Sequence, residues 1–387
     1  MADKPQVILS GFADEAAYHK TAVEQFAPLA ALGMHYYSLR AIDAGRGIKN
    51  VLLLTTAEIQ KIRHQEDEYD MSVASIGSPI GKVKLLDVDD GTKNPFVPFK
   101  RYLAKEVHRA CELAHAFETK LIRGFSFYPP AGDDPWKHLP QAVDQIGQIA
   151  EACHRSDLTF GLEVEANLVG RDGLILAEIH RQVNHPALML VFDAANLVCQ
   201  GFTTSEVFAH YQAMKPALGW MHIKDYRTAR PSRGVKGPVA TRVLKKGTGT
   251  SRQHESDDNT SRSLGASPLF HRAAKTKTRA ATTRKQPVDE AALRNFVPVG
   301  MGNSGYEEIL RDFRESIPAL EKRLRRRGIP GVFLELEPHL KAGGQFGGAS
   351  GPDGMGVALR ALLRVLDFVG IGYGLRTYED VRAGCEA

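Results

Sequence analysis

The sequence predicts a (β/α)8 barrel, because strand-like and helix-like segments alternate along nearly the whole chain. Eight short apolar runs are each followed by a segment with helical spacing or helix-forming composition. The expected strands are residues 7–15, 35–40, 73–82, 120–130, 159–165, 188–196, 218–225 and 331–338. A doubly wound open sheet of similar length is the alternative fold.

The expected helices are marked by apolar spacing and by their ends. Residues 21–33 place four apolar side chains at helical spacing and stop at a glycine, and residues 55–65 begin at a threonine that can cap the first turn. We expect residues 305–328 to form one long basic helix. The remaining expected helices are residues 96–117, 136–154, 173–183, 204–214 and 354–370.

Charge is distributed unevenly along the 387 residues, of which 43% are hydrophobic, enough for a large core. Residues 229–286 hold fourteen Lys/Arg and three acids, a net charge of +11, whereas the whole chain carries +5. The rest of the chain is therefore mildly acidic, at −6. This distribution argues against nucleic acid as the partner of the folded part.

The same residues, 229–286, are rich in Thr, Ser, Gly and basic side chains, with Phe270 as their one aromatic residue. Such a segment buries too little apolar surface to offset the entropy of ordering. We expect a long disordered basic insertion after the seventh strand, which leaves residues 1–228 and 287–387 as a single barrel domain. A dispensable insertion is the simplest interpretation, and a mobile lid or a basic tether for an anionic partner is the alternative.

Four cysteines lie far apart in the sequence and form no CxxC pair. Reduced, structural thiols in a cytoplasmic protein are therefore expected. The N-terminal apolar run is too short for a signal peptide, and no run approaches the ~18 apolar residues of a membrane span. No membrane association is expected.

Carboxylates and one histidine stand where the last four expected strands end. In a barrel of this kind the carboxyl ends of the strands form one face, so these side chains can converge. Three carboxylates and an imidazole suit a divalent ion such as Mn, Mg, Co or Fe, and without a cation they would repel one another. The alternative is that each acid caps a helix or pairs with a nearby cation. The candidates are Glu163 or Glu165, Asp193, His222, and Glu335 or Glu337, because spacing alone does not choose within either pair.

Several motifs, in order, resemble the sugar phosphate isomerase/epimerase group of the xylose isomerase-like barrel superfamily. They are SIGSPIGK (75–82), IRGFSFY (122–128), LEVEAN (162–167), FDAAN (192–196), HIKD (222–225), VPVGMGNSGY (297–306) and LEPHL (336–340). The resemblance covers nearly all of the chain except the expected insertion. It implies that Glu163, Asp193, His222 and Glu337 hold one divalent metal, which could be Mn, Mg, Co, Fe or Zn. The chain departs from many relatives in lacking an Asn directly after the first Glu of LEVEAN.

The resemblance also implies a chemistry, namely proton abstraction next to the carbonyl of a small sugar substrate. Glu163 and Glu337 would move the proton through an enediolate intermediate, which gives isomerisation or epimerisation. Loss of a β-leaving group from the same intermediate would instead make a dehydratase or lyase acting on a keto-sugar or inosose. The sequence leaves these outcomes open.

Further polar residues near the expected strand ends are candidate substrate contacts. Salt bridges that hold the mouth of the barrel together are the alternative role for each of them. The candidates are Arg40, Lys82, Arg123, Glu165, Asn196, Lys224, Asp225 and His339.

Two rival functions follow from the same fold. A DNA-repair enzyme resembling endonuclease IV would need a three-zinc cluster with several histidines, which the second and third strand ends, SLR and SIGSP, do not supply. A catalytically inactive sugar-binding barrel would be expected to lose an acid or the histidine, and all four are present. Members of the superfamily often form dimers or tetramers, so a homo-oligomer is an expectation of the resemblance.

Overall fold

The computed structural model describes residues 4–228, 295–341 and 349–386. Its main sheet holds nine parallel strands in the order β13-β1-β12-β9-β8-β7-β6-β5-β2. The strands are β1 (Gln6–Gly11), β2 (Tyr36–Leu39), β5 (Ser72–Gly77), β6 (Leu121–Gly124), β7 (Thr159–Glu163), β8 (Leu188–Asp193), β9 (Leu218–Ile223), β12 (Phe333–Leu336) and β13 (Gly372–Gly374).

The sheet curls until its two ends meet. β1 pairs with β12 on one side, and a bridge from Phe12 to Ser38 brings the end of β1 beside β2 on the other. Eight strands thus close a barrel, and β13 adds a ninth strand next to β1. The predicted (β/α)8 barrel is confirmed, and the alternative open sheet is wrong.

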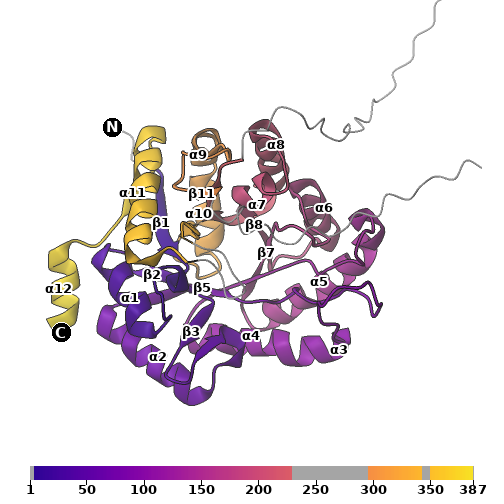
Figure 1. Ribbon diagram of the computed structural model, residues 1–387, viewed down its shortest axis with the longest axis horizontal. Coiled ribbons are helices and arrows are strands. Elements are labelled where there is room, and N and C mark those ends of the chain that lie inside the picture. The colour runs from indigo at the N-terminus through magenta and orange to yellow at the C-terminus, as the bar shows by residue number, and fades with distance from the viewer. Residues whose placement is uncertain (1–3, 229–294, 342–348, 387) are drawn as a thin grey trace, which may run out of the picture. The chain divides into compact units, whose positions relative to one another are not determined.

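Helices surround the barrel (Figure 1). They are α1 (Ala22–Ala31), α2 (Thr56–Tyr69), α3 (Phe99–Tyr102), α4 (His108–Ala116), α5 (Leu139–Arg155), α6 (Gly173–Val183), α7 (Ala194–Val198), α8 (Thr204–Met214), α9 (Tyr306–Arg314), α10 (Ile317–Arg325), α11 (Gly351–Val369) and α12 (Tyr378–Glu386). A π-helical segment, Leu103–Val107, joins α3 to α4. The expected cap of α2 is present, because Thr55 and Glu58 form a reciprocal capping box.

One predicted helix is wrong in extent. Residues 305–328 form two helices, α9 and α10, with the break at Glu315 and Ser316. Pro318 lies in the first turn of α10, where its missing N–H costs nothing, whereas inside a continuous helix it would remove a hydrogen bond. Four further elements were not predicted: the small antiparallel pair β3 (Ala41–Asp43) and β4 (Ile48–Asn50), the strand β13 and the helix α12.

The barrel interior is filled by large side chains, and one glycine makes room for them. Trp220 of β9 is fully buried, and a Cβ at Gly161 of β7, two strands away across β8, would lie 2.0 Å from its ring. Only glycine therefore fits at position 161 beside this tryptophan. The packed interior leaves the carboxyl ends of the strands as the place for polar chemistry.

The expected insertion, residues 229–286, lies outside the described residues. The chain on its two sides is held together, because β10 (Asp225–Tyr226) pairs antiparallel with β11 (Phe296–Val297). The backbone N–H of Arg227 also donates to the carbonyl of Asn295 at 2.9 Å. The chain therefore leaves the barrel and returns to it at adjacent points.

Candidate metal centre

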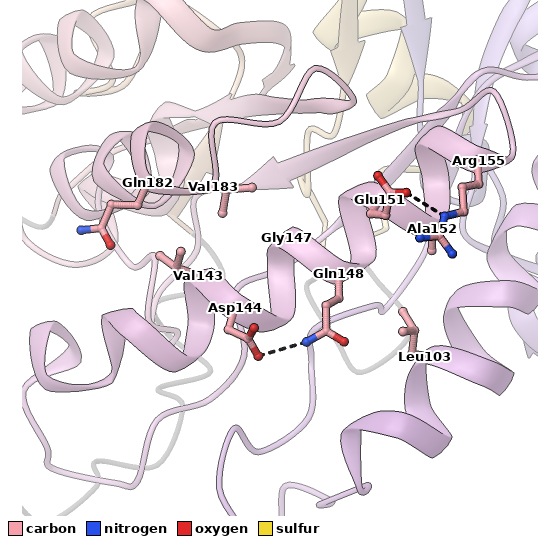
Figure 2. A pocket seen from close by; sticks show the side chains of 10 residues that line it. All are labelled: Leu103, Val143, Asp144, Gly147, Gln148, Glu151, Ala152, Arg155, Gln182 and Val183. Atoms are coloured by element: carbon pink, nitrogen blue, oxygen red, sulfur yellow. Dashed lines mark hydrogen bonds and ion pairs between the residues drawn. The ribbon is translucent and has the colours of Figure 1, made fainter.

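A groove of about 500 Å³ lies on the outside of the barrel, between α5, α6 and the π-helical segment (Figure 2). The polar side chains of α5 in this groove pair with each other: Gln148 donates to Asp144 at 3.0 Å and Arg155 to Glu151 at 2.7 Å. This groove brings together none of the residues that the sequence analysis selected.

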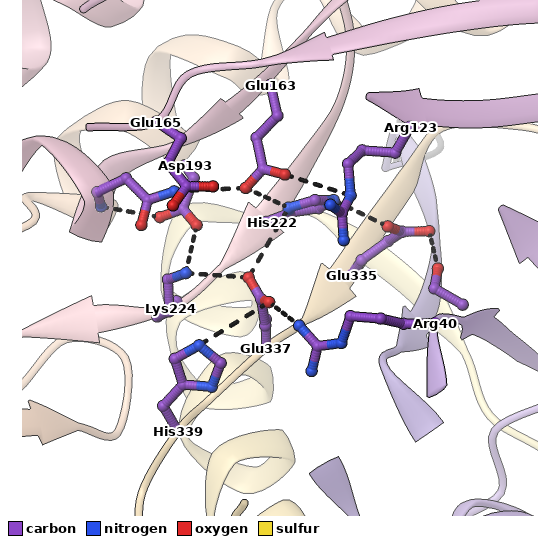
Figure 3. Close-up of polar contacts among 12 residues, drawn as sticks. Arg40, Arg123, Glu163, Glu165, Asp193, His222, Lys224, Glu335, Glu337 and His339 are labelled. Atoms are coloured by element: carbon purple, nitrogen blue, oxygen red, sulfur yellow. Dashed lines mark hydrogen bonds and ion pairs between the residues drawn. The ribbon is translucent and has the colours of Figure 1, made fainter. Parts of the chain in front are cut away.

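Four of those residues meet instead at the carboxyl ends of four adjacent strands (Figure 3). Glu163 is the last residue of β7, Asp193 the last of β8, His222 lies in β9, and Glu337 directly follows β12. All four are buried, and one ligand atom from each lies within 4.8 Å of the others. The structure thus converges four side chains that are up to 174 positions apart in the sequence.

Each carboxylate in this group has one oxygen that contacts a residue outside the group. Arg123 lies 3.3 Å from Oε2 of Glu163, Arg40 donates to Oε1 of Glu337, and the backbone N–H of Asn196 donates to Oδ1 of Asp193 at 3.1 Å. The second oxygen of each carboxylate is left to face the group. Partners of this kind orient metal ligands in known sites.

His222 is oriented in the same way. Its Nε2 lies 3.1 Å from Oε2 of Glu335, and Oε1 of Glu335 accepts a hydrogen bond from Ser38 at 2.5 Å. Its Nδ1 faces the group, 3.1 Å from Glu163 and 3.9 Å from Glu337. Glu335 therefore lies behind the histidine, and Glu337 lies with the inward-facing ligand atoms.

Several of these buried atoms lie close to an oppositely charged atom, but the angles do not allow a hydrogen bond. Oδ2 of Asp193 and both ring nitrogens of His222 have no partner in hydrogen-bond geometry among the described residues. Buried polar atoms left in this state are rare, and an ion is one explanation for them. These four side chains could therefore hold a metal ion.

Among the described residues, this end of the barrel holds more acids than Lys/Arg side chains. The buried acids are Asp14, Glu15, Glu163, Asp193, Asp225, Glu335 and Glu337, and the cations are the buried Lys20, Arg123 and Lys224 and the partly buried Arg40. Oxygen and imidazole donors suit hard or borderline ions such as Mg, Mn, Co, Fe or Zn.

The metal-free pKa values reflect this crowding. Burial alone would raise the pKa of Glu163, but attraction to His222 and Arg123 outweighs it and lowers the pKa to about 2. Burial likewise opposes ionisation of Glu337, yet Lys224 and Arg40 hold its pKa well below the usual range. Burial raises the pKa of Asp193 to about 6. For His222, attraction to Glu163 outweighs burial and raises the pKa to about 10.

Lys224 bridges two members of the group. Its Nζ lies 2.8 Å from Oδ2 of Asp193 and donates to Oε2 of Glu337 at 3.0 Å. It is buried, and its charge lies beside the oxygens that a metal would use. Asn196 is adjacent as well, because its side chain donates to Oε1 of Glu163 at 3.3 Å.

Three other predicted residues lie around the group with different partners. Lys82 and Glu165 pair with each other at 2.8 Å, and both are partly exposed. Asp225 is buried under the segment 300–304, where its carboxylate accepts the backbone N–H groups of Gly300, Gly302 and Ser304. Asp225 thus has the contacts of a residue that orders a loop.

Two functional candidates escaped the sequence analysis. Asp14 and Glu15 follow β1 and are fully buried. Glu15 accepts from Nδ1 of His339 at 2.6 Å and from its backbone N–H at 3.1 Å, which holds His339 at a φ of 51°. The signal was present, because the apolar run of β1 ends in two consecutive acids, as the runs of the later strands end in acids.

Comparison with known proteins places the chain in a family. Residues 26–339 match the model of the xylose isomerase-like TIM barrel family, and the protein belongs to that family. No curated protein matches the sequence. In the part of the chain that the structure describes, no helix combines the length and apolarity needed to cross a bilayer.

Solved structures agree on the fold. The probable 3-DHS dehydratase AsbF of Bacillus anthracis is 15% identical, with a TM-score of 0.53 over 92% of this chain and 98% of that one. A xylose isomerase-like TIM barrel protein of Mycobacterium smegmatis, in complex with magnesium, is also 15% identical, with a TM-score of 0.53 over 94% and 97%. A D-allulose 3-epimerase of Methylomonas sp. is 13% identical, with a TM-score of 0.51 over 95% and 100%.

Proposed function

We propose that the protein is a metal-dependent isomerase or epimerase that acts on a sugar or keto-sugar. The observation that carries this proposal is the convergence of Glu163, Asp193, His222 and Glu337, each with one ligand atom facing the others. Solved structures of similar fold, namely a D-allulose 3-epimerase, a probable dehydratase and a xylose isomerase-like barrel in complex with magnesium, support the choice of class. The identity of the metal is left to experiment.

The two glutamates are the proposed proton carriers. They come from β7 and from the end of β12, with β8 and β9 between them in the sheet, so they approach the centre from different sides. Both are ionised at neutral pH, since the pKa of Glu163 is about 2 and that of Glu337 is well below its usual range. Carboxylates of such low pKa are weak bases. Activation must therefore act on the substrate.

A divalent ion supplies that activation when bound, because a Lewis acid polarises a carbonyl and acidifies the adjacent C–H. The chain's own contribution is to hold the carboxylates in place. Arg123 and Arg40 fix the outer oxygens of Glu163 and Glu337, which limits the motion of both side chains. We propose that Lys224 and His339, at the same end of the barrel, contact substrate oxygens.

Exchange of the substrate C–H proton tests the proposal. Protein loaded with Mn²⁺ is incubated in D₂O with a panel of keto-sugars, and deuterium incorporation is followed by NMR. The wild type and a Glu165→Gln variant are expected to incorporate deuterium, whereas Glu163→Gln is not. Exchange accompanied by loss of water would assign the elimination outcome, and no exchange across the panel by metal-loaded protein would contradict the proposal.

We also propose that residues 229–286 are dispensable for the reaction. The support is local, because β10 and β11 already join the two sides of this segment. A variant that lacks residues 230–285 should keep turnover and KM within about twofold, consistent with the tolerance of surface insertions. A large rise in KM on deletion would instead assign a lid.

A further inference from the structure

Glu337 belongs to two groups of metal-ligating side chains, one at each of its oxygens. Its Oε2 faces Nδ1 of His222 at 3.9 Å within the group already described. Its Oε1 lies 3.9 Å from Nε2 of His339, and Glu15, Glu337 and His339 form a second group whose ligand atoms lie within 4.8 Å of one another. The two groups share Glu337 and lie side by side at the barrel mouth.

A cation of the protein already lies in the second group. The guanidinium of Arg40 donates to Oε1 of Glu337 through Nη1 and to Oε1 of Glu15 through Nη2, the latter at 3.1 Å. Nε and Nη2 also donate to both oxygens of Asp14, at 3.0 and 3.1 Å. The face of the guanidinium packs on Phe12, with Cζ 4.4 Å from the ring centre.

We propose that Arg40 permanently fills the second of two cation positions that share Glu337, and so limits this end of the barrel to one divalent ion. Arginine suits this role because its guanidinium stays charged and offers donors in a fixed planar fork. The inference rests on the proposed metal site in the first group. Arg40 is thereby a positioning residue, which holds Oε1 of Glu337 while Oε2 faces His222 and Lys224 in the first group.

A second ion could bind here only if it displaced Arg40. The partly buried guanidinium would then lose its hydrogen bonds to three buried carboxylates, Asp14, Glu15 and Glu337. Truncation of the arginine removes this obstacle, and it leaves Glu15 and Glu337 as two carboxylates with less positive charge between them. Such a pair favours a cation.

The test counts bound Mn²⁺ by calorimetric titration and by elemental analysis after gel filtration. We expect one ion for wild type, two for Arg40→Met, and one for the double variant Arg40→Met/Glu15→Gln. Electron paramagnetic resonance gives an independent readout, because two Mn²⁺ ions that share Glu337 broaden each other's signal. Two ions in the wild type, or a folded Arg40→Met protein that binds only one, would overturn the inference.

A single substitution keeps the test decisive if Arg40→Met does not fold. Glu15→Gln leaves Arg40 in place and should still bind one Mn²⁺ with wild-type stoichiometry, whereas loss of that ion would make Glu15 a ligand and overturn the inference. Failure of the proposed function gives a different pattern. Wild type that binds no Mn²⁺ would contradict the proposed function. If Arg40→Met then bound one Mn²⁺ and the double variant Arg40→Met/Glu15→Gln bound none, the role of Arg40 would still be supported.

Discussion

Two segments of the barrel, LEVE at 162–165 and LELE at 334–337, have the same spacing of acids but use them in opposite ways. In the first segment the earlier acid, Glu163, lies in the metal group, and Glu165 pairs with Lys82 near the surface. In the second segment the later acid, Glu337, lies in the group, and Glu335 lies behind His222. The same local sequence therefore places its two carboxylates at different depths.

The difference arises from where each strand ends relative to its neighbours. β7 ends at Glu163, so Glu165 already belongs to the following loop. β12 aligns Glu335 with His222 of β9 and ends at Leu336, which puts Glu337 just beyond the strand. In a barrel the strands are staggered by its shear, and this stagger decides which of two acids on one face reaches the centre.

The pH dependence of metal binding is the largest expected effect. Glu163 and Glu337, the inward members of the two segments, are ionised throughout the working range, so protons compete with the metal at Asp193 and His222. The metal-free pKa values are about 10 for His222 and about 6 for Asp193. Lowering the pH should therefore weaken Mn²⁺ binding about tenfold per unit between pH 8 and 6, where His222 is protonated, and about a hundredfold per unit below pH 6, where Asp193 is protonated as well. Calorimetry between pH 5 and 8 measures this slope, and a flat profile would contradict the assignment.

Substituting the two acids of the first segment one at a time distinguishes their roles. Glu163→Gln should lower Mn²⁺ affinity by more than about a hundredfold, because it removes a ligand and not only a partner of one. Glu165→Gln is the matched control, since it changes the same chemical group two residues away and should stay within about threefold. Equal losses of Mn²⁺ affinity in the two variants would contradict the assignment of Glu163, and not Glu165, as the ligand.

The second segment gives a smaller expected effect. Glu335→Gln keeps the shape of the side chain but weakens its interaction with Nε2 of His222. Loss of such a partner typically lowers metal affinity by roughly 10–100-fold. The affinity of Glu335→Gln should therefore fall between those of Glu163→Gln and Glu165→Gln in the same titration. A Mn²⁺ affinity equal to that of wild type would show that Glu335 does not orient His222 for metal binding.

The pair at the surface gives the smallest effect. Lys82→Met breaks the ion pair with Glu165, in which both side chains are about one-third exposed. Exposed pairs contribute roughly 0–1 kcal/mol, so thermal stability and metal affinity should change little. A selective rise in KM without a change in metal affinity would place Lys82 in the substrate site.

The alternation of segments predicted the barrel correctly, because periodicity and caps such as Thr55 are local properties that the sequence displays. The structure brings Glu163, Asp193, His222 and Glu337 together, and their role as metal ligands stays a prediction. The choice within each acid pair depends on strand stagger, which no local pattern encodes. The role of Glu15 was missed because its partners, Arg40 and His339, come from distant parts of the chain.

Metal content tests whether the four strand ends hold one divalent ion. Chelator-treated protein is reloaded with Mn²⁺, separated from free ion and analysed for bound metal, alongside His222→Ala and the Glu165→Gln control. We expect one ion per chain in the wild type and in Glu165→Gln, and none retained by His222→Ala. A folded wild type that retains no ion, or a His222→Ala variant that retains it fully, would contradict the claim.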